Sequence, residues 1–143
     1  MFGTFQQSQL RIEVDASAIA ICEALTHPDK LQQWLWPQQL TGDFQQTLVG
    51  GETFTSQLGP LQLINHKVDL LTPTSVRFLL SGSIDGHHEW CWGDGWVQSR
   101  LEGVSLLPLN LAQTAGLLRL RLFLTQEEGD EQPPTAAAPV AAV

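Results

Sequence analysis

Polar and apolar residues alternate most regularly between residues 87 and 102, where the sequence predicts a β-hairpin. The strands meet at Asp94-Gly95, a dipeptide that favours a type I′ turn because both of its central positions need positive φ. This turn places Gly93 opposite Trp96 and gives the hairpin one polar and one mostly apolar face. The apolar face carries three cross-strand pairs: Trp92 with Val97, Trp90 with Ser99, and His88 with Leu101. Such an aromatic face must be covered by another element.

The residues before the hairpin predict one strand, two short helices and further strands. Apolar and polar positions alternate over 5–14, which predicts a half-buried strand. Ser17 can cap a helix over 18–26, and Pro28 suits the first turn of a second helix over 28–35. From residue 40 onward, turn signals recur at intervals of roughly ten residues, which is typical of an antiparallel meander. The predicted strands of this meander lie near 44–49, 52–58, 61–70, 74–82, 87–93 and 96–105.

A long leucine-rich helix follows the hairpin. Asn110 and Gln113 have the spacing of a capping box and predict a helix over 111–125. We expect one stripe of this helix to lie on the sheet and contact the space over the hairpin tryptophans; the stripe consists of Leu111, Ala115, Leu118 and Leu122. Three more leucines, Leu117, Leu120 and Leu124, widen it. Arg119 is expected to project toward the rim.

Composition sets the class of protein. The 143 residues suit one domain over 1–126, followed by an acidic and then Pro- and Ala-rich tail over 127–143 that we expect to be disordered. The net charge of −8 and the seven scattered basic residues argue against a nucleic-acid partner. The apolar run 106–124 contains two arginines, so we expect no stable membrane insertion. Without a signal-peptide pattern, Cys22 and Cys91 are expected to be free thiols in a cytoplasmic protein.

The cluster of His87, His88, Glu89 and Cys91 contains three residue types that can bind a metal ion. Alternate positions on a strand share a face, but His87 and Cys91 are about 13 Å apart along it, too far to hold one ion. We therefore expect a solvated outer face with a Glu89–Arg100 ion pair and no metal. The sequence also contains no nucleophile turn or phosphate-binding loop, so no catalytic residue and no cofactor is assigned.

His66 and His88 are the stronger single candidates because both are predicted on inward faces of strands. An ionisable group on an apolar wall can orient a ligand or exchange a proton, and it can equally be a core histidine bonded to a backbone carbonyl. The neighbouring aromatic residues are core residues first, and they line a cavity if the helix lies high enough. The candidate ligand-binding residues are Phe54, His66, Phe78, His88, Trp90, Trp92, Leu118 and Leu122.

Residues 4–126 resemble the SRPBCC superfamily, also called START-like or birch-pollen-allergen-like. The resemblance is carried by IEVDASAIAICEALTHPDKLQQWLW and by central-strand positions: Gly50-Gly51 before Phe54, Val68 with Leu71-Thr-Pro73, Val76 and Phe78. It implies an α+β helix-grip fold, in which a curved antiparallel sheet of six to seven strands packs against a long C-terminal helix. Members use an apolar cavity between sheet and helix for lipids, sterols, polyketides or quinones, and some are cyclases or hydrolases. Others, related to the activator of a heat-shock chaperone ATPase, act on a protein partner.

Three functions follow from this interpretation. The first is binding of a small apolar ligand between sheet and helix by a monomer or homodimer, because inward Leu, Trp and Phe are abundant and no catalytic set is assembled. The second is an enzyme of the polyketide cyclase or hydrolase type, and the third is a protein-interaction domain with a collapsed cavity. A void of roughly 300 Å³ or more favours the first, a close acid–base pair the second, and a filled interior with an exposed apolar patch the third.

Overall fold

The computed structural model describes residues 2–60 and 62–131 and contains one antiparallel sheet of seven strands in the order β1-β7-β6-β5-β4-β3-β2. The strands are β1 (Thr4–Glu13), β2 (Gln39–Thr41), β3 (Thr53–Leu58), β4 (Gln62–Thr72), β5 (Ser75–Gly82), β6 (Asp85–Gly93) and β7 (Trp96–Ser105). Strands β2 to β7 lie side by side in sequence order, and β1 pairs with β7 at the edge. The α+β helix-grip architecture expected from the sequence is therefore confirmed.

The register of the β6–β7 hairpin is the one predicted, with Gly93 opposite Trp96 and Trp90 opposite Ser99. Its turn type is different. Gly95 has a φ of 82°, whereas no residue other than glycine has positive φ among those described, so the φ signs are those of a type II turn and not of type I′. Asp94 is held by the start of the first helix, because its Oδ1 accepts a hydrogen bond of 2.7 Å from the Ala18 amide.

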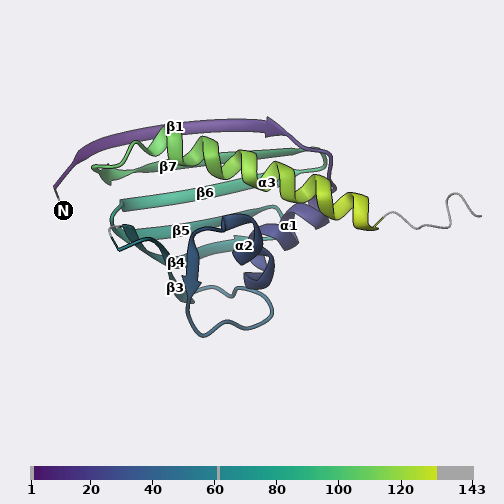
Figure 1. The fold of residues 1–143 in the computed structure, drawn as a ribbon, viewed down its shortest axis with the longest axis horizontal. Helices are drawn as coiled ribbons and strands as arrows, with labels where there is room; N and C mark the ends of the chain where they lie inside the picture. The colour runs from purple at the N-terminus through teal and green to yellow at the C-terminus, as the bar shows by residue number, and fades with distance from the viewer. Residues whose placement is uncertain (1, 61, 132–143) are drawn as a thin grey trace, which may run out of the picture.

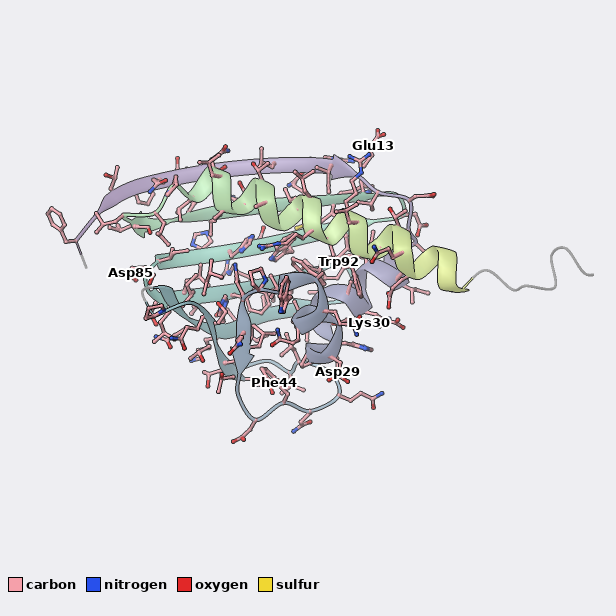
Figure 2. The ribbon with its side chains drawn as sticks, viewed as in Figure 1. Glu13, Asp29, Lys30, Phe44, Asp85 and Trp92 are labelled. Atoms are coloured by element: carbon pink, nitrogen blue, oxygen red, sulfur yellow. The ribbon has the colours of Figure 1, made fainter. Side chains whose placement is uncertain are left out.

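Three helices cover one face of the sheet: α1 (Ala18–Thr26), α2 (Pro28–Leu35) and α3 (Leu109–Glu131). Figure 1 shows α3 crossing the sheet from the β1–β7 edge toward α1, with α2 over the central strands. Ser17 caps α1 as predicted, since its side chain accepts from the Ala20 amide at 3.2 Å. Lys30, labelled on α2 in Figure 2, ties the helices together through ion pairs with Glu23 and Glu127.

The predicted strand over 44–49 is wrong, and the edge strand is instead Gln39–Thr41. The chain at 44–49 does not pair with the sheet: Phe44 packs on the Phe54 ring, with centroids 5.7 Å apart, and the rest of the segment turns toward the first helix. The Leu48 amide donates to the Thr26 carbonyl at 2.8 Å, and the Leu48 side chain is buried. A close approach at Gly42, where an added Cβ would lie 3.0 Å from Phe54 Cβ, marks the point at which the chain leaves the sheet.

Helix α3 is longer than predicted, and the capping box is wrong. The helix begins at Leu109, so Asn110 and Gln113 lie inside it and bond to β1 instead of to each other. At the other end it runs through Glu131, beyond the start of the predicted tail at 127. The remainder of that tail, 132–143, lies outside the described residues.

The face of α3 that contacts the sheet also differs from the prediction. All four residues of the expected stripe are exposed, Leu118 by 50% and Leu122 by 64%. Leu117 and Leu120 are buried instead. The leucines surround much of the helix, so their spacing alone did not select a face. The buried Gln113, which hydrogen-bonds to β1 and β7, fixes the rotation of the helix.

Candidate ligand-binding cavity

A cavity of about 120 Å³ lies between the inward face of the sheet and the three helices. Aliphatic and aromatic side chains form most of its wall. Five of the candidate residues line it: Phe54, His66, Phe78, His88 and Trp90. The polar groups on its wall come from six residues: Gln38, Ser56, His66, His88, Gln113 and Arg119. The arrangement is typical of small-molecule sites, which are mostly apolar with a few inward polar groups.

The volume of about 120 Å³ is below the roughly 300 Å³ at which drug-sized ligand pockets begin. It is close to the scale of an engineered apolar cavity of about 150 Å³ that binds benzene. The cavity therefore suits one ring or a short branched alkyl group and does not enclose a sterol without rearrangement.

One wall of the cavity is an aromatic cluster built by three adjacent strands. The His66 ring on β4 stacks on the Phe54 ring of β3, with centroids 4.6 Å apart and an interplanar angle of 5°. Phe78 on β5 meets both rings edge-on, at 5.7 Å from Phe54 and 5.8 Å from His66. The register explains this packing, because Phe54 lies directly opposite His66. Nε2 of His66 is 2.9 Å from the Ser56 hydroxyl rather than at a backbone carbonyl, and its Nδ1 is buried without a partner.

The other histidine belongs to a polar chain that links the sheet to α3. Nε2 of His88 lies 2.7 Å from Oγ of Ser99, which also accepts a hydrogen bond of 3.0 Å from Gln113 Nε2. Gln113 continues the chain to β1, donating to the Ser8 carbonyl and accepting from the Ser8 hydroxyl. The His88 ring also packs on Trp90, with centroids 4.6 Å apart. These contacts hold His88 in one orientation at the cavity wall.

Both cavity histidines are neutral at physiological pH. Burial lowers the pKa of His66 to about 4. Burial, with smaller contributions from His66 and His87, lowers the pKa of His88 to about 3. Neither ring has a carboxylate partner among the described residues that would favour its charged form. The two imidazoles therefore act as polar, uncharged groups.

Helices α1 and α2 line part of the cavity, and α3 contributes Ala112 together with three residues spaced three apart: Gln113, Gly116 and Arg119. Gly116 is buried, yet a Cβ added to it would meet no atom within 4 Å. Space is therefore left open directly beside the helix backbone. Arg119 is half-buried, and its Nε atom is buried without a hydrogen-bond partner. Sequence reasoning missed both residues because it assigned the opposite side of α3 to the sheet.

The remaining candidates lie away from the cavity. Trp92 is 2% exposed and fully packed in the core, and it is not part of the cavity wall. Leu118 and Leu122 lie on the exposed side of α3, so, contrary to expectation, they do not line the cavity. Trp34, which the sequence analysis did not single out, lines the cavity, meets Trp90 edge-on at 6.0 Å and donates to the Ala24 carbonyl.

The opposite face of β6 carries His87, Glu89 and Cys91. Glu102, rather than Glu89, binds Arg100 at 2.9 Å, and it also lies 3.2 Å from His87. The predicted Glu89–Arg100 ion pair is therefore wrong, although the two residues are opposite in register. Burial raises the pKa of the Cys91 thiol, and both cysteines are free. The described residues contain no group of three or more metal-ligating side chains.

Comparisons with known proteins give matches of fold and not of sequence. No protein-family model and no curated protein matches the chain. DynU16, from the dynemicin biosynthetic locus, is 17% identical with a TM-score of 0.63 over 83% of this chain, which spans 47% of DynU16. Aha1 from Colwellia psychrerythraea, solved as a dimer, is 22% identical with a TM-score of 0.63 over 83% of this chain and 96% of that chain. MLL2253 from Mesorhizobium loti is 14% identical with a TM-score of 0.64, over 85% of this chain and 98% of that chain.

These overlaps, the strand order and the placement of α3 show that the chain shares the helix-grip fold of these structures, which is the fold that the sequence resemblance to SRPBCC proteins implied. A shared fold does not by itself establish a function. In the described part of the chain, no helix has the length and apolar character that crossing a bilayer requires.

Proposed function

We propose that this protein binds a small, mostly apolar molecule of about one-ring size in the cavity beneath α3. The observation that carries the proposal is the open space at Gly116. A glycine inside a helix is about 1 kcal/mol less favourable than alanine, and here its missing side chain leaves a void that an apolar ligand would fill. The polar groups on the wall supply orientation, as expected of a binding site.

Binding is better supported than catalysis for this cavity. A general acid or base works best with a pKa near the operating pH, whereas burial lowers the pKa of His66 to about 4 and that of His88 to about 3. Asp, Glu, Cys and Lys are missing from the cavity wall formed by the described residues. The polyketide cyclase or hydrolase alternative therefore has no acid–base pair to carry it.

The test is native mass spectrometry of the protein purified from its own host, compared with the Gly116→Leu variant. The wild type should carry a small molecule that is released on denaturation, and the variant, whose cavity is filled by leucine, should not. Ala115→Leu places the same side chain at the neighbouring exposed position and should retain the molecule. Equal loading of the wild type and Gly116→Leu would contradict the proposal.

A second candidate function is self-association through the exposed side of α3. Leu111, Leu118 and Leu122 are 67%, 50% and 64% exposed and follow one another along this side, which is unusual for solvent-facing positions. A single apolar stripe can pair with its own copy across a two-fold axis, and the similar fold of Colwellia Aha1 was solved as a dimer. Sedimentation should show a dimer that Leu118→Glu converts to a monomer. A monomeric wild type at high concentration would exclude this function.

A further inference from the structure

We propose that the ligand is a small apolar acid whose carboxylate is bound by Arg119 while its apolar part occupies the cavity. This inference rests on the proposed function and specifies the chemical class of the ligand. It starts from the one residue on the cavity wall whose charge is permanent, because the two cavity histidines are uncharged near pH 7.

Arg119 has no counter-charge in the described part of the chain. The ion pairs found there occupy Lys30, Arg77 and Arg100, together with His87. The Arg11 guanidinium lies 4.2 Å from the Trp96 ring centroid. Lys67 and Arg121 also have no ion pair, but both are exposed, whereas Arg119 lines the cavity. The chain has 15 acidic and seven basic residues, so the isolation of Arg119 does not come from a shortage of carboxylates.

The position of Arg119 suits it to bind an anionic group in the cavity. Its spacing from Gly116 and Gln113 turns it toward the cavity side of α3, and its buried Nε has no acceptor. Removing an N–H donor from water is unfavourable unless an acceptor replaces the water. A carboxylate is the matching group, because its two oxygens can accept two parallel hydrogen bonds from one guanidinium.

The cavity restricts the apolar part of such an acid. A volume of about 120 Å³ holds a group on the scale of one aromatic ring. The stacked Phe54–His66 pair and Phe78 present aromatic surface to that group. An arylacetic or short branched alkanoic acid has this combination of one anionic end and one compact apolar end.

The experiment compares phenylacetate with phenylacetamide, which is nearly the same size but uncharged, by NMR titration at neutral pH. The wild type should bind the acid at least about tenfold more tightly than the amide. Arg119→Met keeps much of the apolar stem and should bring the two affinities to within about threefold without weakening the amide. Arg121→Met, at an exposed position on the same helix, should keep the preference for the acid.

Each other result has a definite meaning. Equal binding of acid and amide by the wild type, or a preference that survives Arg119→Met, would overturn the inference and leave the proposed function standing. Failure of the wild type to bind either compound would contradict the proposed function as well. If Arg119→Met does not fold, Arg119→Gln gives the same comparison with a polar side chain, and the acid-to-amide ratio of the wild type remains decisive.

Discussion

Nε2 of His88 lies 2.7 Å from Oγ of Ser99, and this contact joins a half-buried histidine of β6 to the adjacent strand β7. Ser99 is fully buried and is also bonded by Gln113 from α3, so the histidine belongs to a chain of polar groups inside an apolar wall. A low-dielectric environment favours the uncharged imidazole, because a charge placed there loses its hydration. The stability of the fold should therefore depend on pH through this group.

We expect the free energy of unfolding to fall when the pH is lowered from about 7 to 5. An unfolded histidine has a pKa of about 6.5. Burial lowers the pKa of His66 to about 4 and that of His88 to about 3. The unfolded state thus binds more protons in this window, so the stabilisation is complete above about pH 6.5 and is lost as the pH falls. The loss should be on the order of 2 kcal/mol for each histidine.

Urea denaturation at several pH values measures this dependence. The double variant His66→Gln, His88→Gln should lose most of it, although its stability at pH 7 is lower than that of the wild type. An equally steep dependence in both proteins would show that carboxylates, rather than these histidines, control the sensitivity to acid.

Gly116→Ala should stabilise the protein by about 0.5–1 kcal/mol in chemical denaturation. Alanine has the higher helix propensity, and its Cβ at this position meets nothing within 4 Å. The reverse change at the neighbouring exposed position, Ala115→Gly, should destabilise by a similar amount. A loss of stability in Gly116→Ala would mean that the space beside this residue is already filled.

Leu117→Ala and Leu118→Ala provide a matched pair on α3. Leu117 is 1% exposed and should cost about 2–5 kcal/mol when truncated, because the change removes buried area and leaves a void. Leu118 is 50% exposed and should cost less than about 1 kcal/mol. Thermal or urea unfolding of the two variants gives the comparison, and a large cost at Leu118 would indicate that another surface covers it.

Trp90→Ala should destabilise the fold by roughly 3–5 kcal/mol. The ring is buried, meets Trp34 edge-on at 6.0 Å and packs on His88, so its loss disturbs both the helical and the sheet wall of the cavity. Exposed Trp36 is the control, and Trp36→Ala should change stability little. Comparable costs for the two variants would contradict the assigned core.

Much of the fold could be predicted because local signals agreed with one another. The turn at Asp94-Gly95 and the alternation around Trp90 fixed the hairpin register, and Ser17 and Pro28 fixed the starts of the two short helices. The strand at 44–49 failed for a non-local reason. A hydrogen bond from Leu48 to Thr26 draws that segment onto α1, and no pattern within the segment encodes the contact.

The positions that face the cavity were predicted on the sheet, apart from Trp92, but not on the helix. A strand has two faces, so placing Trp90 inward also places His88 inward, and the register sets His88 opposite Phe78 of the next strand. A helix with leucine around most of its circumference offers several faces, and the rotation of α3 depends on the partners of Gln113 in β1 and β7. For that reason Arg119 and Gly116 were not recognised as cavity residues.

The most direct test of the account is binding of toluene, followed by NMR chemical-shift changes of backbone amides in the wild type, Gly116→Leu and Ala115→Leu. The account predicts saturable shifts in the wild type and in Ala115→Leu, centred on the cavity residues His88 and Gly116. It predicts none in Gly116→Leu. Absence of saturable shifts in the wild type, or undiminished binding by Gly116→Leu, would show that the space beneath α3 is not a ligand site.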